Sequence, residues 1–379
     1  MIYLDYAAAT PMNPKVIEAM TPFFAEQFFN PSAAYLPAKR VRETYESAKD
    51  DIAHTIGAKG NDLVITSGAT EANNLAFSAV QDSEVLVLET EHASVLNLAK
   101  NFHYQTVKVD KNGRIDLADF RKKLSEKVGF VSISLANNEL GTIQPIAEIA
   151  EIIANERRER LAEGNTRKII FHTDASQALN LININVARLG VDLLTINSAK
   201  IYGPKGVGAL YVKTGTRLTS LINGGHQERG LRAGTENVPY IVGLATALKE
   251  HKEHMDEHIA TEIALHDYLL EQLMKEFPYV KINGMSDATR KNPGVLNFSI
   301  GFADAASVVE WMNLHDICIS SGSACNTGSP KPSHVLMAMY NDEKRAFSSI
   351  RVSLSYRNTR EEIDAFIKAL KAFERIYKQ

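Results

Sequence analysis

The chain has 379 residues, of which 45% are hydrophobic and 23% charged, and its formal net charge is -3. This composition is typical of a globular protein, and this length favours two domains, or three. The small net charge gives no electrostatic footprint for nucleic acid, and no apolar run approaches the roughly 20 residues that a membrane span needs, so neither partner is expected.

The first residues of the chain contain no basic region followed by an apolar one, so they do not look like a secretory signal. We therefore expect a cytoplasmic location. Pro11 and Pro14 break any helix in this segment, and we expect the segment to pack across onto a later part of the fold.

Short β-rich runs alternate with helical stretches between about residues 60 and 215. This alternation is typical of a parallel sheet with helices on both faces, so the sequence predicts an α/β domain. Helices are expected over residues 71–80, 117–126 and 146–161, the last with apolar residues at helical spacing. Strands are expected over residues 63–66, 85–88, 106–109, 130–135, 169–173, 193–197 and 208–212.

The pattern changes beyond about residue 240, where a long helical stretch covers residues 238–276. The remainder predicts a smaller α+β unit, with strands over residues 295–300, 317–320 and 350–353 and a terminal helix from Glu361. We therefore expect a large α/β domain of residues 15–245 and a small α+β domain made of residues 1–14 and 246–379.

Asp174 and Lys200 each stand just past the end of an expected strand. A carboxylate that can meet a pyridinium nitrogen and a lysine that can form a Schiff base are the two protein groups that pyridoxal phosphate (PLP) chemistry needs. In open parallel sheets both would converge at the carboxyl ends of the strands. The pair therefore points to a PLP site.

Other polar residues stand at similar positions. Residues 67–71, Ser-Gly-Ala-Thr-Glu, follow the first strand of the large domain and open a helix, which makes a cradle for a phosphate. His92 follows the next strand and could lie over a flat aromatic cofactor. The residues expected at this one edge of the sheet are Thr70, His92, Asn138, Asp174, Gln177 and Lys200.

The chain has two cysteines, which exclude a disulfide framework, and without a CxxC pair no structural zinc site or other metal site is expected. Cys318 lies in a mostly apolar run that predicts a strand, where a free cysteine is usually structural. Cys325 lies among Gly, Ser and Pro residues, which predicts a mobile, exposed loop. An exposed thiol on such a loop suggests a chemical role.

These segments resemble, nearly end to end and in the same order, the class I cysteine desulfurases of the NifS and IscS type. That family has the aspartate aminotransferase-like fold (fold type I) of PLP enzymes. The resemblance implies a large domain with a mostly parallel seven-stranded sheet flanked by helices, and a smaller α+β domain. It is carried by residues 3–5, 30–32, 66–74, 91–92, 137–142, 174–177, 200–212, 228–237, 320–325 and 349–353.

By this resemblance Lys200 would hold PLP as a Schiff base, Asp174 would keep its pyridine nitrogen protonated, and His92 would stack on its ring. Thr235 would reach the phosphate of a neighbouring subunit, which implies a homodimer with shared sites. The full set of implied cofactor contacts is Ala69, Thr70, His92, Asn138, Asp174, Gln177, Asn197, Ser198, Lys200 and Thr235.

The resemblance also implies the reaction. Asn138 and Arg351 would steer the carboxylate of L-cysteine, for which the guanidinium fork of an arginine is suited. Lys200 would move a proton, His92 would assist catalysis, and the thiolate of Cys325 would attack the substrate sulfur. The products would be L-alanine and a Cys325 persulfide, which the loop could carry to a sulfur-acceptor protein.

The sequence departs from the usual family pattern beside the lysine. Ala199 stands where histidine is usual and Asn197 where a phosphate-binding serine is usual, so Ser198 is expected to compensate at the phosphate. A selenocysteine lyase, another fold type I PLP enzyme and an inactive scaffold stay open as alternatives. The sequence does not distinguish iron–sulfur cluster assembly from tRNA or cofactor thiolation as the destination of the sulfur.

Overall fold

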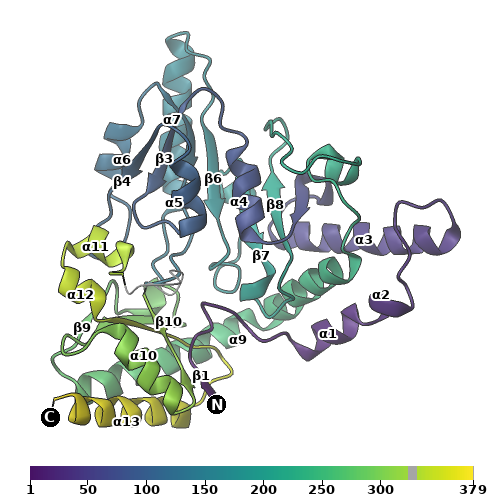
Figure 1. Cartoon of the computed structure of the whole chain (residues 1–379). Helices are drawn as coiled ribbons and strands as arrows, with labels where there is room; N and C mark the ends of the chain where they lie inside the picture. Colours follow the sequence, from purple (N-terminus) through teal and green to yellow (C-terminus); the bar gives the residue numbers. More distant parts are fainter. Residues whose placement is uncertain (323–330, 379) are drawn as a thin grey trace.

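The computed structural model describes residues 1–322 and 331–378, and its larger part is a seven-stranded sheet flanked by helices (Figure 1). Only β8 runs antiparallel, to both β2 and β7, so the predicted mostly parallel sheet is confirmed. In the order of the sheet, the strands are β2 (Leu63–Thr66), β8 (Gly208–Val212), β7 (Leu193–Asn197), β6 (Ile170–Asp174), β5 (Val128–Ser132), β3 (Glu84–Leu88) and β4 (Tyr104–Val107).

Both faces of this sheet are covered, which explains why its strands are apolar runs rather than alternating ones. Leu86 and Leu88 of β3 face one apolar layer, while Val85 and Val87 face the other. The helices that follow its strands are α4 (Ala69–Phe77), α5 (Ala93–Ala99), α6 (Leu117–Lys123), α7 (Ile146–Ala162) and α8 (Val186–Leu189).

The smaller part is built on a second, antiparallel sheet in the order β12 (Ser320–Ser321), β13 (Ser349–Ser353), β10 (Val295–Ser299) and β9 (Lys281–Ile282). Its core includes Phe298, Val352 and Phe366, all fully buried. The helices of this part are α10 (Ala305–Leu314), α11 (His334–Tyr340), α12 (Glu343–Phe347) and α13 (Arg360–Tyr377).

Helix α9 (Val238–Glu276) joins the two parts and has the bounds that the sequence predicts. Near its start Leu244 and Leu248 belong to the core of the large sheet, and further along Leu269 and Leu273 belong to the core of the small one. A boundary at residue 245 would therefore fall inside a continuous helix, and the domain boundaries stay a prediction.

The N-terminal segment packs across onto the smaller part, as expected from the sequence. Strand β1 (Ile2–Tyr3) pairs in parallel with β11 (Ile317–Cys318), and Leu4 is fully buried in the core beneath (Figure 1). The expectation that Pro14 breaks any helix is wrong, because Pro14 is the first residue of α1 (Pro14–Met20). A backbone N–H at this position has no acceptor within the helix, so proline, which lacks the N–H, fits there.

Two further helices precede the large sheet, namely α2 (Pro22–Ala25) and α3 (Leu36–Thr55), and α3 packs against α9. No helix in the described part of the chain combines the length and the apolar character that a membrane span requires.

Candidate active site

A cavity of about 430 Å³ opens at the carboxyl ends of the central strands, where Asp174 ends β6 and Asn197 ends β7. It brings together most of the residues predicted for the site, from the large sheet and from β13 of the small one. The predicted residues that line it are Ala69, Thr70, His92, Asn138, Asp174, Gln177, Asn197, Lys200 and Arg351.

Three predicted residues are not in this lining. Ser198 is fully buried beside Gly203, and the suggestion that it could compensate at the phosphate stays a prediction. Thr235 is exposed outside the cavity, and its predicted role toward a neighbouring subunit stays a prediction. Cys325 lies outside the described residues.

One end of the cavity is the start of α4. Gly68 precedes this helix with a φ of 147°, a conformation that side chains rarely allow, and no side chain caps the first amides of the helix. Thr70 lies in the first turn, and the cavity lining there also includes Ser67 and Asn197. Uncapped amides at a positive helix end fit an anionic group such as a phosphate.

The cavity wall also holds the carboxylate of Asp174, which is only 8% exposed. Its two oxygens accept hydrogen bonds from Asn73 Nδ2 and from the Ser176 amide, each at 2.9 Å. Asn73 is oriented in turn because Thr195 Oγ1 donates to its Oδ1 at 2.8 Å. Asp174 therefore has a fixed orientation as an acceptor, which suits a protonated ring nitrogen.

His92 caps the start of α5, and its Nδ1 accepts a hydrogen bond from the Ser94 amide at 3.1 Å. An amide only donates, so the neutral ring carries its proton on Nε2. Burial, with Lys200 and His334 nearby, lowers the pKa of His92 against the opposing effect of Asp174. The lowered pKa favours the neutral ring, with its hydrogen on Nε2.

Lys200 ends a short 3-10 turn (Ser198–Lys200) that follows β7. Its Nζ donates to the carbonyl of Ala7 at 2.9 Å and to that of Ala8. Gln177 Nε2 also donates to the Ala7 carbonyl, at 2.9 Å. The N-terminal segment carries no predicted site residue, but it positions the Lys200 amine and the Gln177 amide, which were both predicted for the site.

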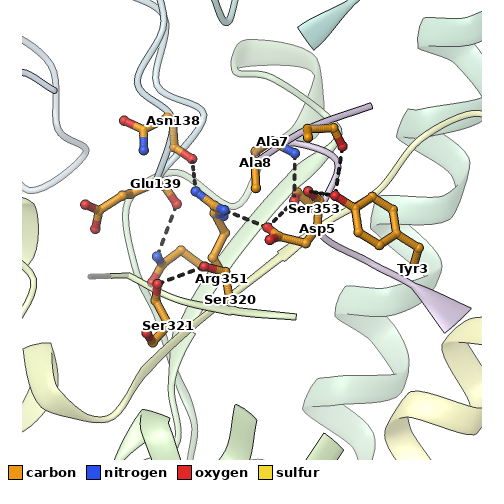
Figure 2. Close-up of polar contacts among 12 residues, drawn as sticks. Tyr3, Asp5, Ala7, Ala8, Asn138, Glu139, Ser320, Ser321, Arg351 and Ser353 are labelled. Carbon is orange, nitrogen blue, oxygen red and sulfur yellow. Dashed lines mark hydrogen bonds and ion pairs between the residues drawn. The ribbon is translucent and has the colours of Figure 1, made fainter. Parts of the chain in front are cut away.

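Arg351 lies on β13, only 4% exposed, between two fixed acceptors (Figure 2). Its Nη2 forms an ion pair with Asp5 Oδ1 at 2.6 Å, and its Nη1 donates to the Asn138 carbonyl at 3.1 Å. Asp5 is anchored in turn, since Tyr3 OH donates to the Asp5 carbonyl at 3.0 Å. The guanidinium is therefore oriented by both parts of the molecule.

Two buried polar atoms of the cavity wall, Arg351 Nε and Ser176 Oγ, have no hydrogen-bond partner among the described residues. Buried polar groups are almost always satisfied, so such a pair indicates a polar ligand or water in the cavity. Across the described ranges, no group of three or more His, Cys, Asp and Glu side chains is placed to hold a metal ion.

The structure also adds residues that the sequence did not single out. Ser134 and Ser176 lie just beyond strand ends, the same signal that identified Asn138 and Gln177, but serine is too common there to be informative. No local signal marks the N-terminal contributors. The additional lining residues are Ala7, Ala8, Ser94, Ser134, Ala136, Asn137 and Ser176, beside Ser67, Gly68 and Glu71 of the predicted phosphate cradle.

Comparisons with known proteins agree with this geometry. The family model described as aminotransferase class-V matches residues 2–366. The cysteine desulfurase IscS of Dictyoglomus turgidum is 38% identical over 380 residues, covering 97% of this chain and 93% of the relative. Among solved structures, a NifS-like protein from Rickettsia africae is 33% identical with a TM-score of 0.87, and both chains are covered completely, at 100%.

A further similar structure is described as SspA in complex with cysteine. It is 31% identical, has a TM-score of 0.78, and covers 95% of this chain and 100% of its own. Because that similarity extends over nearly the whole chain, the cavity described above belongs to the matched region.

Proposed function

The chain belongs to the aminotransferase class-V family and is a cysteine desulfurase of the NifS and IscS type, and we propose that its cavity binds PLP and L-cysteine and transfers the cysteine sulfur to Cys325. The observation that carries this proposal is the meeting of Lys200, Asp174 and Arg351 in one cavity. A lysine amine, an oriented carboxylate and an oriented guanidinium are what an amino acid and a pyridine cofactor require together.

The residues present fit PLP. Lys200 would hold it covalently through Nζ, Asp174 would accept from its ring nitrogen, and His92 would cover its ring. The uncapped amides before Thr70 would hold its phosphate, and Gln177 would contact its ring hydroxyl. When bound, PLP supplies an electron sink that weakens the bond between Cβ and sulfur of the substrate.

The residues of the chain would divide the remaining tasks. Arg351 and Asn138 would bind the substrate carboxylate, and the Lys200 amine would move a proton at the substrate Cα. The Cys325 thiolate would then attack the sulfur, so that the Cβ–S bond breaks and an S–S bond forms. The substrate carbon skeleton leaves as L-alanine, and Cys325, outside the described residues, keeps the sulfur as a persulfide.

A homodimer is part of this proposal. The segment from α1 to the start of α3 exposes several large apolar side chains, with Phe24 at 59%, Phe28 at 66% and Leu36 at 62% exposure. Figure 1 shows this segment extending away from the large sheet. An apolar patch of this kind is a common protein interface, and a second copy of the chain would cover it.

We also propose a cytoplasmic enzyme that hands the persulfide sulfur to an acceptor protein, for iron–sulfur cluster assembly or for thiolation. The support for the acceptor is chemical, because the outer sulfur of a persulfide is a transferable group.

The test is release of alanine and sulfide from L-cysteine by the purified protein, beside Cys325→Ser, Lys200→Ala and Cys318→Ser. We expect a visible absorbance band in the wild type and both cysteine variants, and none in Lys200→Ala. Activity should be lost in Cys325→Ser and kept in Cys318→Ser, since Cys318 is half-buried on β11. Sulfide release at the wild-type rate by Cys325→Ser would instead support a lyase.

A further inference from the structure

A buried carboxyl group lies directly behind the cavity wall. Glu91, the residue before His92, is only 2% exposed. Its Oε1 accepts a hydrogen bond from the Ser134 amide at 2.7 Å, and its Oε2 forms a very short hydrogen bond with Ser134 Oγ. Ser134 itself lines the cavity, whereas Glu91 does not. Glu91 therefore reaches a ligand only through Ser134.

Glu91 has no cationic partner within the described ranges of the chain. The carboxylate of Asp174 is a charged group that acts on it, and His334 donates to its backbone carbonyl, at 2.9 Å, rather than to its side chain. The His92 ring is engaged with Ser94. Burial and then Asp174 raise the pKa of Glu91 to about 8, against the two hydrogen bonds that the Ser134 amide and hydroxyl would donate to the ionised form.

The geometry fixes where the proton of this acid lies. Oε1 faces an amide N–H, so it must accept, and the carboxyl proton is on Oε2. Oε2–H then donates to Ser134 Oγ, which uses one lone pair of that hydroxyl. The Ser134 hydroxyl forms no second hydrogen bond with the described residues, so its own hydrogen is left to be donated into the cavity.

We propose that Glu91 and Ser134 form a hydrogen-bond relay that presents the Ser134 hydroxyl hydrogen to an anionic oxygen of the bound ligand. Ser134 is the binding residue and Glu91 is a positioning residue. The anionic oxygen belongs either to the carboxylate of cysteine or to the phenolic group of PLP, so the inference rests on the proposed function of the cavity.

The direction of the hydrogen bond between Glu91 and the Ser134 hydroxyl depends on pH. When Glu91 loses its proton, its carboxylate becomes an acceptor, and the Ser134 hydroxyl turns to donate to it instead of to the ligand. Affinity for the anionic oxygen therefore falls as the pH rises through the pKa of Glu91. A glutamine at this position would accept from the Ser134 amide and donate to Ser134 Oγ at every pH, so Glu91→Gln should remove this fall.

The experiment measures two constants at about pH 7 and about pH 9, on either side of this titration. One is the Kd of the apoprotein for PLP, from absorbance titration, and the other is the KM of the holoenzyme for L-cysteine. The variants are Glu91→Gln and Ser134→Ala. The matched controls are Glu89→Gln and Ser132→Ala. In the wild type, the Glu89 carboxylate accepts a hydrogen bond from the Val109 amide at 3.0 Å, and the Ser132 hydroxyl pairs with His172.

We expect Ser134→Ala to raise one of the two constants about tenfold or more at pH 7, the usual effect of losing a hydrogen bond to a charged group. Glu91→Gln should match the wild type at pH 7 and keep that value at pH 9, where the wild type weakens. The control variants should follow the wild type. A change in Kd alone assigns the contact to PLP, and a change in KM alone assigns it to cysteine.

A Ser134→Ala variant with both constants unchanged would overturn the relay. So would a Glu91→Gln variant as weak at pH 7 as Ser134→Ala, because Glu91 would then act as a carboxylate. Infrared difference spectra between the two pH values provide a second readout, with a band of a protonated carboxylic acid in the wild type that Glu91→Gln lacks. A wild-type apoprotein that binds no PLP would instead refute the proposed function.

Discussion

Arg351 is oriented before any substrate arrives. Asp5 and the Asn138 carbonyl each occupy one terminal nitrogen, and Nε has no partner among the described residues. A guanidinium fixed in this way loses little conformational freedom when it grips a carboxylate, so more of the interaction energy appears as affinity. The planar fork, and not the charge alone, is the feature that a lysine cannot reproduce.

We therefore predict that Arg351→Lys raises the KM for L-cysteine about 10- to 100-fold while kcat changes much less. Steady-state kinetics with the holoenzyme measures this. The control is Arg357→Lys, because the Arg357 guanidinium lies over the Tyr202 ring, 4.7 Å from its centre, and does not line the cavity. An unchanged KM in Arg351→Lys would show that the carboxylate binds elsewhere.

The sequence predicted the residues of this site that follow strands of the large sheet, because strand ends can be located from apolar runs and their convergence follows from the fold. Asp5 could not be predicted in this way. Its partner Arg351 lies 346 residues further along the chain, and no local pattern connects them. The sequence also did not show that the Ser198 side chain is fully buried and does not line the cavity.

At the scale of elements, β8 determines the shape of the turn that opens α4. A Cβ atom at Gly208 would lie 2.5 Å from the Ile196 carbonyl oxygen and 2.8 Å from Gly68 Cα. The antiparallel strand β8 can therefore lie this close to the Gly68 turn only because residue 208 is glycine. This close contact supports the backbone that presents the first amides of α4.

We predict that Gly208→Ala displaces this turn, lowers the free energy of unfolding by more than about 2 kcal/mol and weakens PLP binding. Chemical denaturation and PLP titration of the apoprotein measure the two effects. Gly215→Ala is the control, because Gly215 has a φ of +90° but open space around its Cβ position, so it should cost roughly 1 kcal/mol and leave PLP binding intact. Equal losses in both variants would contradict the close-contact argument.

Elements were predictable where their pattern was long. Helix α9 (Val238–Glu276) has the predicted bounds because apolar residues at helical spacing mark both of its ends, although residues 249–258 between them are almost all polar. Strand β5 (Val128–Ser132) begins and ends earlier than the predicted 130–135, although the amides of Ile133 and Leu135 still donate to the carbonyls of His172 and Asp174. Helix α3 (Leu36–Thr55) was not predicted, since it is rich in charged residues and gains its stability by packing on α9.

At the scale of the whole molecule, stability depends on carboxyl groups that folding buries. Burial raises the pKa of Glu262 on α9 to about 8, against one hydrogen bond from the Tyr356 backbone, while its ordinary value is 4.5. Between these values the folded protein binds more protons than the unfolded chain. The free energy of unfolding therefore falls as the pH rises from about 4.5 to about 8.

Glu262→Gln should reduce this fall, because an amide has no charge to bury. Urea denaturation at about pH 5 and about pH 8 gives the difference for each protein. Glu257→Gln is the matched control on the same helix, since the Glu257 side chain is 81% exposed. If Glu262→Gln and the wild type lose equal stability over this range, Glu262 is not protonated in the folded state.

Association should depend on the exposed apolar segment between α1 and α3. We predict that Phe24→Asp combined with Phe28→Asp weakens dimer formation at least tenfold, because a buried unpaired charge is costly at an interface. Sedimentation equilibrium over a range of concentrations measures this. Leu314→Asp is the control, as Leu314 is 75% exposed at the end of α10. A monomeric wild type would refute the proposed homodimer.

The contact between Asp5 and Arg351 also determines when the protein can become active. At a synthesis rate of about 5 to 20 residues per second, the 346 residues between them take roughly 20 to 70 seconds to make. A nascent chain therefore displays Asp174 and Lys200 well before the arginine that completes their cavity. The substrate-binding end is assembled only after Arg351 has been made, later than both Asp174 and Lys200, which delays sulfur chemistry until that point.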